Sequence, residues 1–164
     1  MSVCYVGLGA NVEDPEAHIT RALKAFQQSP QWTLLTVSSL YRSQPLGPQD
    51  QPDFYNAVAA LTTSLPALDA LDWLLNQEQQ QGRVRLRHWG ERCLDLDLLL
   101  YDDQVIEHER LSVPHRELCK RSFVVMPLLE IAPDLMLPDG RFLRDISPEF
   151  DGQLQRLSPP VIDI

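Results

Sequence analysis

Two aspartates separated by one residue stand beside an apolar run, in the stretch LDLDLLL at residues 94–100. Side chains alternate along a β-strand, so Asp95 and Asp97 would share one face and the leucines around them the other. The unbroken leucines that follow indicate a strand covered on both sides. A carboxylate that is partly removed from water needs a cationic partner, because losing its hydration costs on the order of several kcal/mol.

Mg²⁺ suits such a pair of carboxylates. It takes one or two protein carboxylates and fills its remaining positions with water and substrate phosphate. Asp95 and Asp97 therefore predict a magnesium site for phosphate chemistry. The alternative for an Asp-x-Asp pair is a solvated polar strand face.

Residues 83–121 concentrate positive charge in a chain that is otherwise acidic. The chain has 14 Lys and Arg against 23 Asp and Glu, a net charge of -9, and this segment holds eight of the basic and eight of the acidic residues. Such a balance argues against nucleic acid or an anionic membrane as a partner. A local arginine cluster instead predicts a small, highly anionic ligand. The basic residues are Arg83, Arg85, Arg87, Arg92, Arg110, Arg116, Lys120 and Arg121.

Four arginines before the aspartates surround two glycines and a tryptophan. They are Arg83, Arg85, Arg87 and Arg92, around Gly82, Trp89 and Gly90. Mobile guanidinium groups suit a phosphate clamp that closes as water leaves, and the alternative is a basic surface loop. No GxxxxGK[ST] or GxGxxG motif supplies a phosphate cradle. The stretch GLGAN at residues 7–11 reads only as a turn. We therefore expect side-chain arginines and metal to hold the anion.

Composition indicates a cytoplasmic protein. Cys4, Cys93 and Cys119 are odd in number and lack CxxC spacing, so neither a disulfide framework nor a zinc site is supported. No run of 18 apolar residues occurs, and the N-terminus lacks the basic region of a signal peptide. With 164 residues, of which 44% are hydrophobic, the chain suits one domain over residues 1–164. We expect the residues from about 150 onward to form a peripheral tail, and the protein to be a monomer.

Apolar periodicity predicts the elements that position these residues. Strands are expected at 3–9, 32–41, 53–65 and 94–100, and helices at 15–28 and 67–81. A short strand at 105–106, a helix at 116–131 interrupted by Pro127, and a turn at 138–140 follow. The order β-α-β-β-α-β predicts an α+β, ferredoxin-like fold, an antiparallel sheet with helices on one face plus C-terminal additions. The long loop at 42–52 is of the kind that usually carries function.

Several other side chains suit a ring-shaped ligand. Phe54, Trp89 and Phe123 can stack on a planar ring, although an isolated aromatic is more often part of the core. Asn56 offers both a donor and acceptors and can read the edge of a heterocycle. His115 is by itself a surface or capping residue, and its neighbouring arginines make it a candidate phosphate contact.

Five stretches together resemble the 6-hydroxymethyl-7,8-dihydropterin pyrophosphokinase (HPPK) family of folate biosynthesis. In chain order they are GLGAN (7–11), LGPQDQPDFYNAV (46–58), QQGRVR (80–85), HWGERCLDLDLL (88–99) and ERLSVPHRELCKRSFVVMPLLEIAPDL (109–135). The resemblance covers nearly the whole chain from Val3 to about Ile146. It implies a ferredoxin-like fold and transfer of the β,γ-diphosphate of ATP to the hydroxymethyl group of the pterin, giving AMP.

The resemblance also implies residue roles. Asp95 and Asp97 would hold two Mg²⁺ ions, and Arg83 and Arg92 would be the catalytic clamp arginines. The ATP site would be lined by Glu78, Arg85, Trp89, Arg110, Leu111, Ser112, His115 and Arg121. The pterin pocket would be lined by Ser43, Pro45, Leu46, Phe54, Asn56 and Phe123.

Two other classes of function remain open on the residues alone. One is a ferredoxin-like module that binds a nucleotide or pterin without turnover, for which Asp95→Ala would leave ligand affinity unchanged. The other is a metal-dependent phosphohydrolase that uses the same aspartates on a water nucleophile. It would release phosphate without any pterin.

Overall fold

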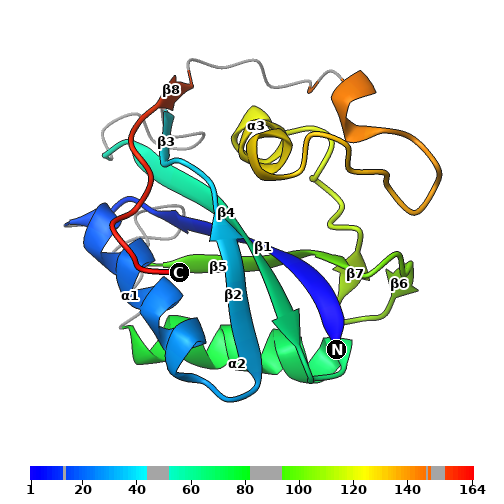
Figure 1. Cartoon of the computed structure of the whole chain (residues 1–164), viewed down its shortest axis with the longest axis horizontal. Coiled ribbons are helices and arrows are strands. Elements are labelled where there is room, and N and C mark those ends of the chain that lie inside the picture. Colours follow the sequence, from blue (N-terminus) through cyan, green and yellow to red (C-terminus); the bar gives the residue numbers. More distant parts are fainter. Residues whose placement is uncertain (13, 44–51, 82–93, 147, 149–153) are drawn as a thin grey trace.

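Figure 1 shows the computed structural model of the chain. The structure describes residues 1–12, 14–43, 52–81, 94–146, 148 and 154–164. Within these residues, an antiparallel sheet is combined with three α-helices, so the expected mixture of helices and an antiparallel sheet is confirmed.

The sheet is built around its two longest strands, β1 (Ser2–Ala10) and β4 (Phe54–Thr63), which pair antiparallel. On the other side of β1 lies β5 (Asp95–Tyr101), also antiparallel. The second neighbour of β4 is the pair β2 (Trp32–Val37) and β3 (Tyr41–Ser43), and β8 (Gln155–Arg156) pairs with β3. The strand order is therefore β5-β1-β4-β3-β8, with β2 also on β4.

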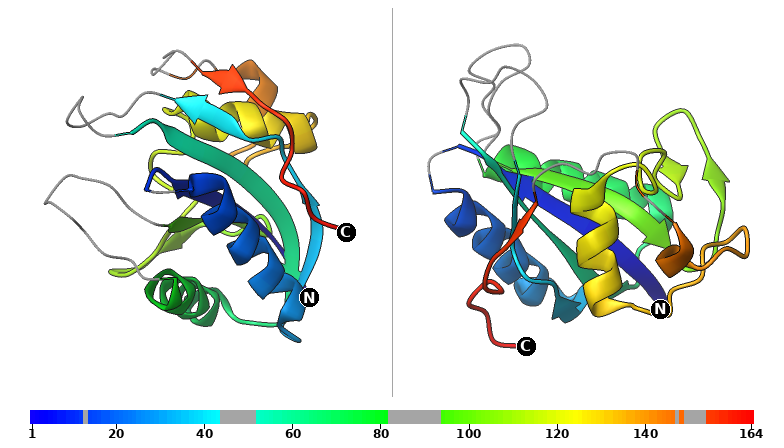
Figure 2. Two further views of the ribbon diagram at one scale, coloured as in Figure 1. Left: turned by 90° about the vertical axis from the view of Figure 1, so that its left-hand side faces the viewer. Right: turned by 90° about the horizontal axis from the view of Figure 1, so that it is seen from above.

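Helices cover the two faces of this sheet unequally (Figure 2). Helices α1 (Pro15–Gln28) and α2 (Ala67–Gln80) pack on one face, where alternate residues of the central strands are apolar and buried. Helix α3 (Ser122–Ile131) packs on the other face with a smaller apolar cluster that includes Val58 and Leu99. The larger core therefore lies under α1 and α2.

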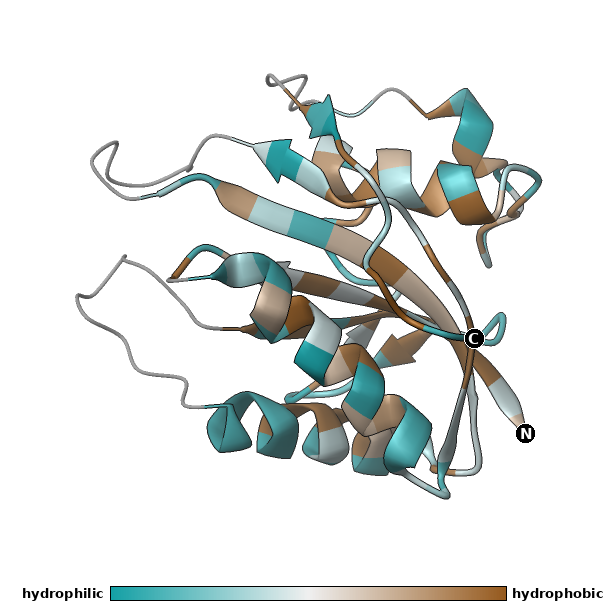
Figure 3. Ribbon diagram, turned by 60° about the vertical axis from the view of Figure 1, so that its left-hand side comes forward, coloured by the Kyte–Doolittle hydropathy of each residue, from teal (hydrophilic) through white to brown (hydrophobic). Residues whose placement is uncertain are grey.

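The sequence of each covering helix explains which side it buries. In α1, Pro15 occupies the first turn, where its missing N–H costs nothing. The buried residues of α1 recur at helical spacing, and polar and apolar segments alternate along the helix in Figure 3. In α2 the buried residues are Ala70, Leu74 and Glu78, spaced by four. A carboxylate thus occupies a core position of α2.

Two predicted elements differ from the structure. The expected strand at 32–41 is two strands, because Ser38 turns inward: its Oγ donates to Ser39 O at 2.8 Å and accepts from Val58 N at 2.9 Å. The expected helix at 116–131 begins only at Ser122. Before it the chain makes tight turns anchored on β5, with His115 N donating to Leu99 O at 3.0 Å. Pro127 lies inside α3 and does not end it.

The remaining elements are short. Strands β6 (Ile106–Glu107) and β7 (Ser112–Val113) form a hairpin, and η1 (Leu143–Asp145) is one 3₁₀ turn. The predicted turn at 138–140 is confirmed, with Gly140 at φ 92°, where a side chain would be strained. No helix in the described part of the chain is both long and apolar enough to cross a bilayer.

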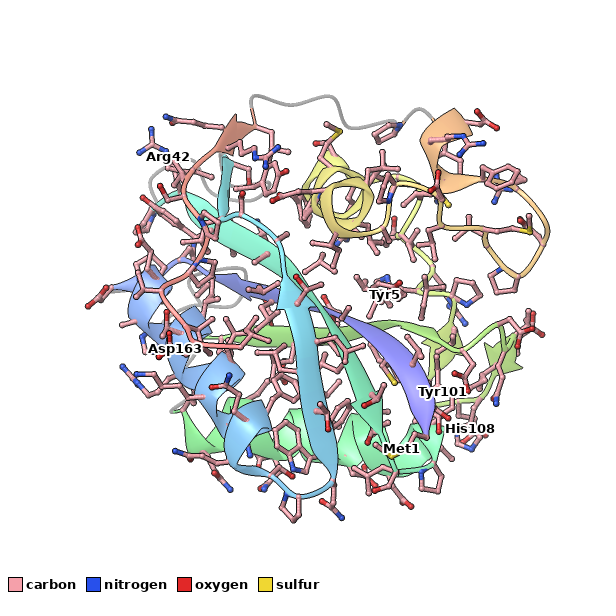
Figure 4. The ribbon with its side chains drawn as sticks, viewed as in Figure 1. Met1, Tyr5, Arg42, Tyr101, His108 and Asp163 are labelled. Atoms are coloured by element: carbon pink, nitrogen blue, oxygen red, sulfur yellow. The ribbon has the colours of Figure 1, made fainter. Side chains whose placement is uncertain are left out.

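The final residues return to the sheet. Leu157 N donates to Leu40 O at 2.7 Å, and Arg42 on β3 donates to Gln155 Oε1 at 2.7 Å. Further on, the carbonyl of Asp163 accepts a hydrogen bond from the Gln27 amide on α1. Figure 4 labels Arg42 and Asp163 at the two ends of this path. The segment 154–164 is thus tied to both β3 and α1.

Candidate active site

The two aspartates project from the face of the sheet on which α3 packs. Along β5 the side chains alternate: Leu96 and Leu98 are buried, whereas Asp95 is half-buried and Asp97 is exposed. Leu99, two residues beyond Asp97, joins the apolar cluster under α3. The predicted separation of leucines and aspartates onto opposite faces is therefore confirmed.

Two glycines of β1 stand directly beside these aspartates. Gly9 pairs with Asp95 and Gly7 with Asp97. Because neither residue has a side chain, neighbouring side chains can approach the backbone of β1 here: Asn56 beside Gly9 and Leu99 beside Gly7. The strand predicted at 3–9 is confirmed and includes both glycines, and β1 extends one residue beyond it to Ala10, where a turn was expected. Alternate glycines in an otherwise apolar strand signal close approach of another group, and that signal could have found them.

Asn56 lies across β1 from the aspartates. Gly9 pairs with Asp95 on one side and with Asn56 of β4 on the other. A Cβ atom on Gly9 would lie 2.7 Å from Asn56 Oδ1, closer than real Cβ contacts allow. The side chain of Asn56 therefore occupies the space that Gly9 leaves. This places an amide and two carboxylates on one face of three adjacent strands.

The predicted ring-binding residues gather around Asn56. On β4, Phe54 lies two residues before Asn56 and therefore on the same face, and both are half-buried. Ser43 of β3 is buried and is the register partner of Phe54. Phe123 lies in the first turn of α3, which packs over the same face of β4. The structure thus brings Ser43, Phe54 and Asn56 together and places the helix that carries Phe123 above them.

Glu78 supports the aspartate strand from its outer edge. It is only 4% exposed, and its Oε2 accepts a hydrogen bond of 2.7 Å from the backbone N–H of Leu96. Leu96 lies between the two aspartates, and β5 is the last strand of the sheet on this side. Among the described residues no further strand pairs with β5 on this side, so Glu78 supplies the hydrogen-bond acceptor for this backbone N–H. The bond holds the backbone of β5 between Asp95 and Asp97.

The predicted ATP contacts after β5 are spread over several environments. Arg110 makes an exposed ion pair with Asp72 of α2. Leu111 is 7% exposed and belongs to the core on the α1 and α2 face. Ser112 Oγ accepts a hydrogen bond of 3.0 Å from Arg116 Nε.

His115 and Arg121 have contacts with β5 and with α3, respectively. His115 is held against β5 by its backbone bond to Leu99, and its Nδ1 accepts from Glu117 N at 3.1 Å. Arg121 precedes α3, with its guanidinium carbon 5.5 Å from the centre of the Phe123 ring. His115 is therefore held beside β5, and Arg121 stands at the start of α3.

Six of the predicted site residues lie outside the described residues. They are the two clamp arginines, two further ATP contacts and two pterin contacts: Arg83, Arg92, Arg85, Trp89, Pro45 and Leu46. Their roles stay predictions.

The donor set fits Mg²⁺ better than a tightly coordinated transition metal. Among the described side chains, no group of three or more His, Cys, Asp or Glu is placed to hold a metal ion. Asp95 and Asp97 supply two carboxylates on one strand face, which is the number that Mg²⁺ usually takes from protein.

Two hollows in the described structure lie away from this face. A groove of about 880 Å³ runs between α1 and residues 156–161, and a smaller one of about 390 Å³ lies near Asn11 and Pro52. None of the predicted site residues lines either groove.

The fold and this site define a class of enzyme, and comparison with known proteins identifies it as the pyrophosphokinases. A protein of Haemophilus influenzae, "2-amino-4-hydroxy-6-hydroxymethyldihydropteridine pyrophosphokinase", is 48% identical over 160 residues, which cover 97% of this chain and 100% of the relative. A protein of the same name from Pseudomonas aeruginosa is 52% identical over 142 residues, covering 87% of this chain and 88% of the relative.

The family model described as 7,8-dihydro-6-hydroxymethylpterin-pyrophosphokinase (HPPK) matches residues 5–133. The chain belongs to this family. The resemblance and the enzyme class predicted from the sequence, a pyrophosphokinase of folate biosynthesis, are thereby confirmed.

The fold is shared with a much more distant solved structure, the wild-type HPPK-DHPS of Plasmodium falciparum. The TM-score is 0.71 at 13% identity over 88% of this chain. The chain spans 44% of that protein's length.

Proposed function

We propose that this chain transfers the β,γ-diphosphate of ATP to the hydroxymethyl group of 6-hydroxymethyl-7,8-dihydropterin. The hydroxyl oxygen attacks the β-phosphorus, the bond from that phosphorus to the α,β-bridging oxygen breaks, and AMP leaves. The hydroxyl proton is lost, and the pterin carries the diphosphate. The observation that carries this proposal is the register across three strands, with Asp95 and Asp97 on one side of Gly7 and Gly9 and Asn56 on the other.

Asp95 and Asp97 would hold two Mg²⁺ ions, and these ions when bound would neutralise charge on the triphosphate. The protein's own part is to position both reactants, which is most of what phosphoryl transfer requires. Asn56 would read the edge of the pterin with its amide, and Phe54 and Phe123 would stack on its two faces. Ser43, Pro45 and Leu46 would complete this pocket.

The triphosphate would lie nearer to β5. Glu78 is bonded to that strand through Leu96, His115 is bonded to it through Leu99, and Arg121 stands at the start of α3. Together with Arg85, Trp89, Arg110, Leu111 and Ser112 they would form the ATP site. Arg83 and Arg92 would close on the transferred phosphates, where a guanidinium group is worth most once water has been expelled.

We also propose a ferredoxin-like single domain over residues 1–164 with C-terminal additions. The strand order β5-β1-β4 followed by β2 and β3, with α1 and α2 on one face, supports this plan. A monomer in the cytoplasm, without nucleic-acid or membrane partners, agrees with the net charge of -9. The free thiols of Cys4 and Cys119 also agree with a reducing compartment.

Phosphorus NMR of the products tests the reaction directly. The protein is mixed with ATP, Mg²⁺ and 6-hydroxymethyl-7,8-dihydropterin, and a parallel sample omits the pterin. We expect stoichiometric AMP and a pterin diphosphate in the first sample only. Release of phosphate in the second would indicate a phosphohydrolase. No change in either sample, with both ligands bound, would indicate a binding module.

A further inference from the structure

Donors from three separate elements converge on one carboxylate at the end of α3. Tyr41 OH on β3 donates to Glu130 Oε1 at 2.8 Å, and Ser39 donates through its backbone N–H at 3.0 Å and its hydroxyl at 2.8 Å. The Arg156 guanidinium of β8 lies 3.1 Å from Glu130 Oε2 and also donates to Ser39 Oγ at 3.2 Å. Glu130 therefore joins α3 to the segment entering β3 and to β8.

This carboxylate connects the two walls of the proposed pterin pocket. Glu130 lies seven residues after Phe123, which is two helical turns, so both project from the same side of α3. Its partner Tyr41 is the register partner of Asn56 on β4. The next residue pair along these two strands on the same face is Ser43 and Phe54. Glu130 thus ties the helix that carries Phe123 to the strands that carry Asn56 and Phe54.

The Tyr41–Glu130 part of the linkage is largely buried and hydrogen-bonded, whereas the Arg156 side chain is 61% exposed. Tyr41 is 4% exposed and the Glu130 side chain is 17% exposed. Burial, followed by the hydrogen bond to Glu130, raises the pKa of Tyr41 to about 12, so its hydroxyl stays a donor at neutral pH. Hydrogen bonds to an ionised carboxylate are stronger than those between neutral groups. Loss of the carboxylate would leave the Tyr41 hydroxyl and the Ser39 backbone N–H without a partner.

We propose that Glu130 is a positioning residue for pterin binding. It touches neither substrate, and it sets the gap between Phe123 on α3 and the Asn56 and Phe54 side chains on β4. This inference rests on the proposed function, because it takes these three residues as the pterin pocket. Through the Glu130 carboxylate, helix α3 and strand β8 would both help to set the geometry of the pterin pocket.

The experiment compares two ligands in four forms of the protein. Titration calorimetry measures the Kd of α,β-methylene-ATP alone, and then that of 6-hydroxymethyl-7,8-dihydropterin at saturating α,β-methylene-ATP. The proteins are wild type, Glu130→Ala, Tyr41→Phe and the control Phe26→Leu. Phe26 is fully buried on α1, on the opposite face of the sheet, so its variant loses stability without touching the linkage. Thermal unfolding then ranks the four proteins by the midpoint temperature of their unfolding transitions.

We expect Glu130→Ala to weaken pterin binding by about tenfold or more, since small displacements of positioning groups have effects of this size. Tyr41→Phe should give a smaller change in the same direction. The Kd of the ATP analogue should stay within about twofold for both, and Phe26→Leu should alter neither affinity. If Glu130→Ala does not fold, Tyr41→Phe decides by the same criterion.

Two results would overturn the inference. One is an equal loss of both affinities in the linkage variants, and the other is no loss of pterin affinity in either variant. In both cases wild type still binds the pterin, so the proposed function stands. Failure of the wild-type protein to bind the pterin at all would overturn the proposed function, and the inference with it.

Discussion

The two faces of the sheet use the same strands for opposite purposes. On β1, Cys4, Val6, Leu8 and Ala10 are buried under α1 and α2, whereas Gly7 and Gly9 alternate with them on the α3 face. The first face maximises apolar contact. The second face gives up side chains altogether at the positions beside Asp95, Asp97 and Asn56. One strand therefore carries core residues on one face and the glycines of the candidate site on the other, at a period of two residues.

The α3 face is itself divided along the strands. Helix α3 covers Val58 and Leu99, which are buried. Asn56 and Asp97 lie two residues earlier on the same strands and on the same face, and their side chains are polar. The packed half fixes the strands, and the open half is then free to keep charges that a core would not tolerate. The packing residues and the polar residues of the candidate site are thus only two positions apart on each strand. Substitutions in the two groups can test their roles separately.

The largest effect should come from the open half. Asp97→Ala should lower kcat/KM by about a thousandfold, the upper range for loss of one preorganised electrostatic group. Because Asp97 is exposed, the midpoint of thermal unfolding should change much less than the activity. The control is Asp103→Ala, at an exposed carboxylate in the turn after β5. Steady-state kinetics of Asp97→Ala near the wild-type rate would remove the central role of this pair.

The covered face should show the reverse pattern. Leu74→Ala in α2 removes a fully buried side chain and should lower the free energy of unfolding by about 2–5 kcal/mol. The neighbouring Leu75 is 38% exposed, so Leu75→Ala should cost well under half as much. Urea unfolding measures both. Well below the unfolding transition, kcat/KM should stay within about twofold of wild type. A large loss of activity in Leu74→Ala would mean that the two faces are not independent.

The glycines of β1 give the sharpest comparison within one strand. A Cβ at Gly9 would meet Asn56 Oδ1 at 2.7 Å, whereas a Cβ at Gly7 would meet the Leu99 side chain at an ordinary 3.6 Å. Gly9→Ala should therefore displace the Asn56 amide and raise KM for the pterin about tenfold, the effect of about one lost hydrogen bond.

Gly7→Ala is the matched control, since it adds the same methyl group to the same strand without striking Asn56. Its KM for the pterin should stay within about threefold of wild type. Equal effects of the two substitutions would show that any side chain on β1 disturbs the site, and that the contact with Asn56 is not special.

The packed face of the sheet could be predicted from the sequence more completely than the face with the candidate site. Alternation placed Asp95 and Asp97 opposite the leucines, and helical spacing located the buried side of α1, because both follow from the local period of the chain. The break at Ser38 and the late start of α3 depend on hydrogen bonds to Val58 and Leu99, which are distant in the sequence. Local pattern has no access to such contacts.

The same limit applies to the supporting residues of the site. The residues themselves pointed to Asp95, Asp97 and Asn56 as candidates, and the resemblance to Glu78, but the need for glycine at position 9 follows from the register of β1 against β4. Likewise, nothing around Glu130 in the sequence indicates that Tyr41 and Arg156 meet there. Glu78 is the instructive exception. Its place in the buried stripe of α2, four residues after Leu74, was a signal for a carboxylate with a backbone partner.

The smallest expected effect concerns Arg110, which the structure pairs with Asp72 and the proposal assigns to ATP. Both side chains are about half exposed, so Asp72→Ala should change the free energy of unfolding by less than about 1 kcal/mol. If Arg110 contacts phosphate during turnover, Asp72 competes for the same guanidinium. Asp72→Ala should then leave KM for ATP unchanged or lower it, whereas Arg110→Ala should raise it. Steady-state kinetics at low and high salt measure both. An equal rise in the two variants would show that the ion pair acts as a structural unit joining α2 to the turn before β7, and would assign Arg110 to the packing side of the molecule.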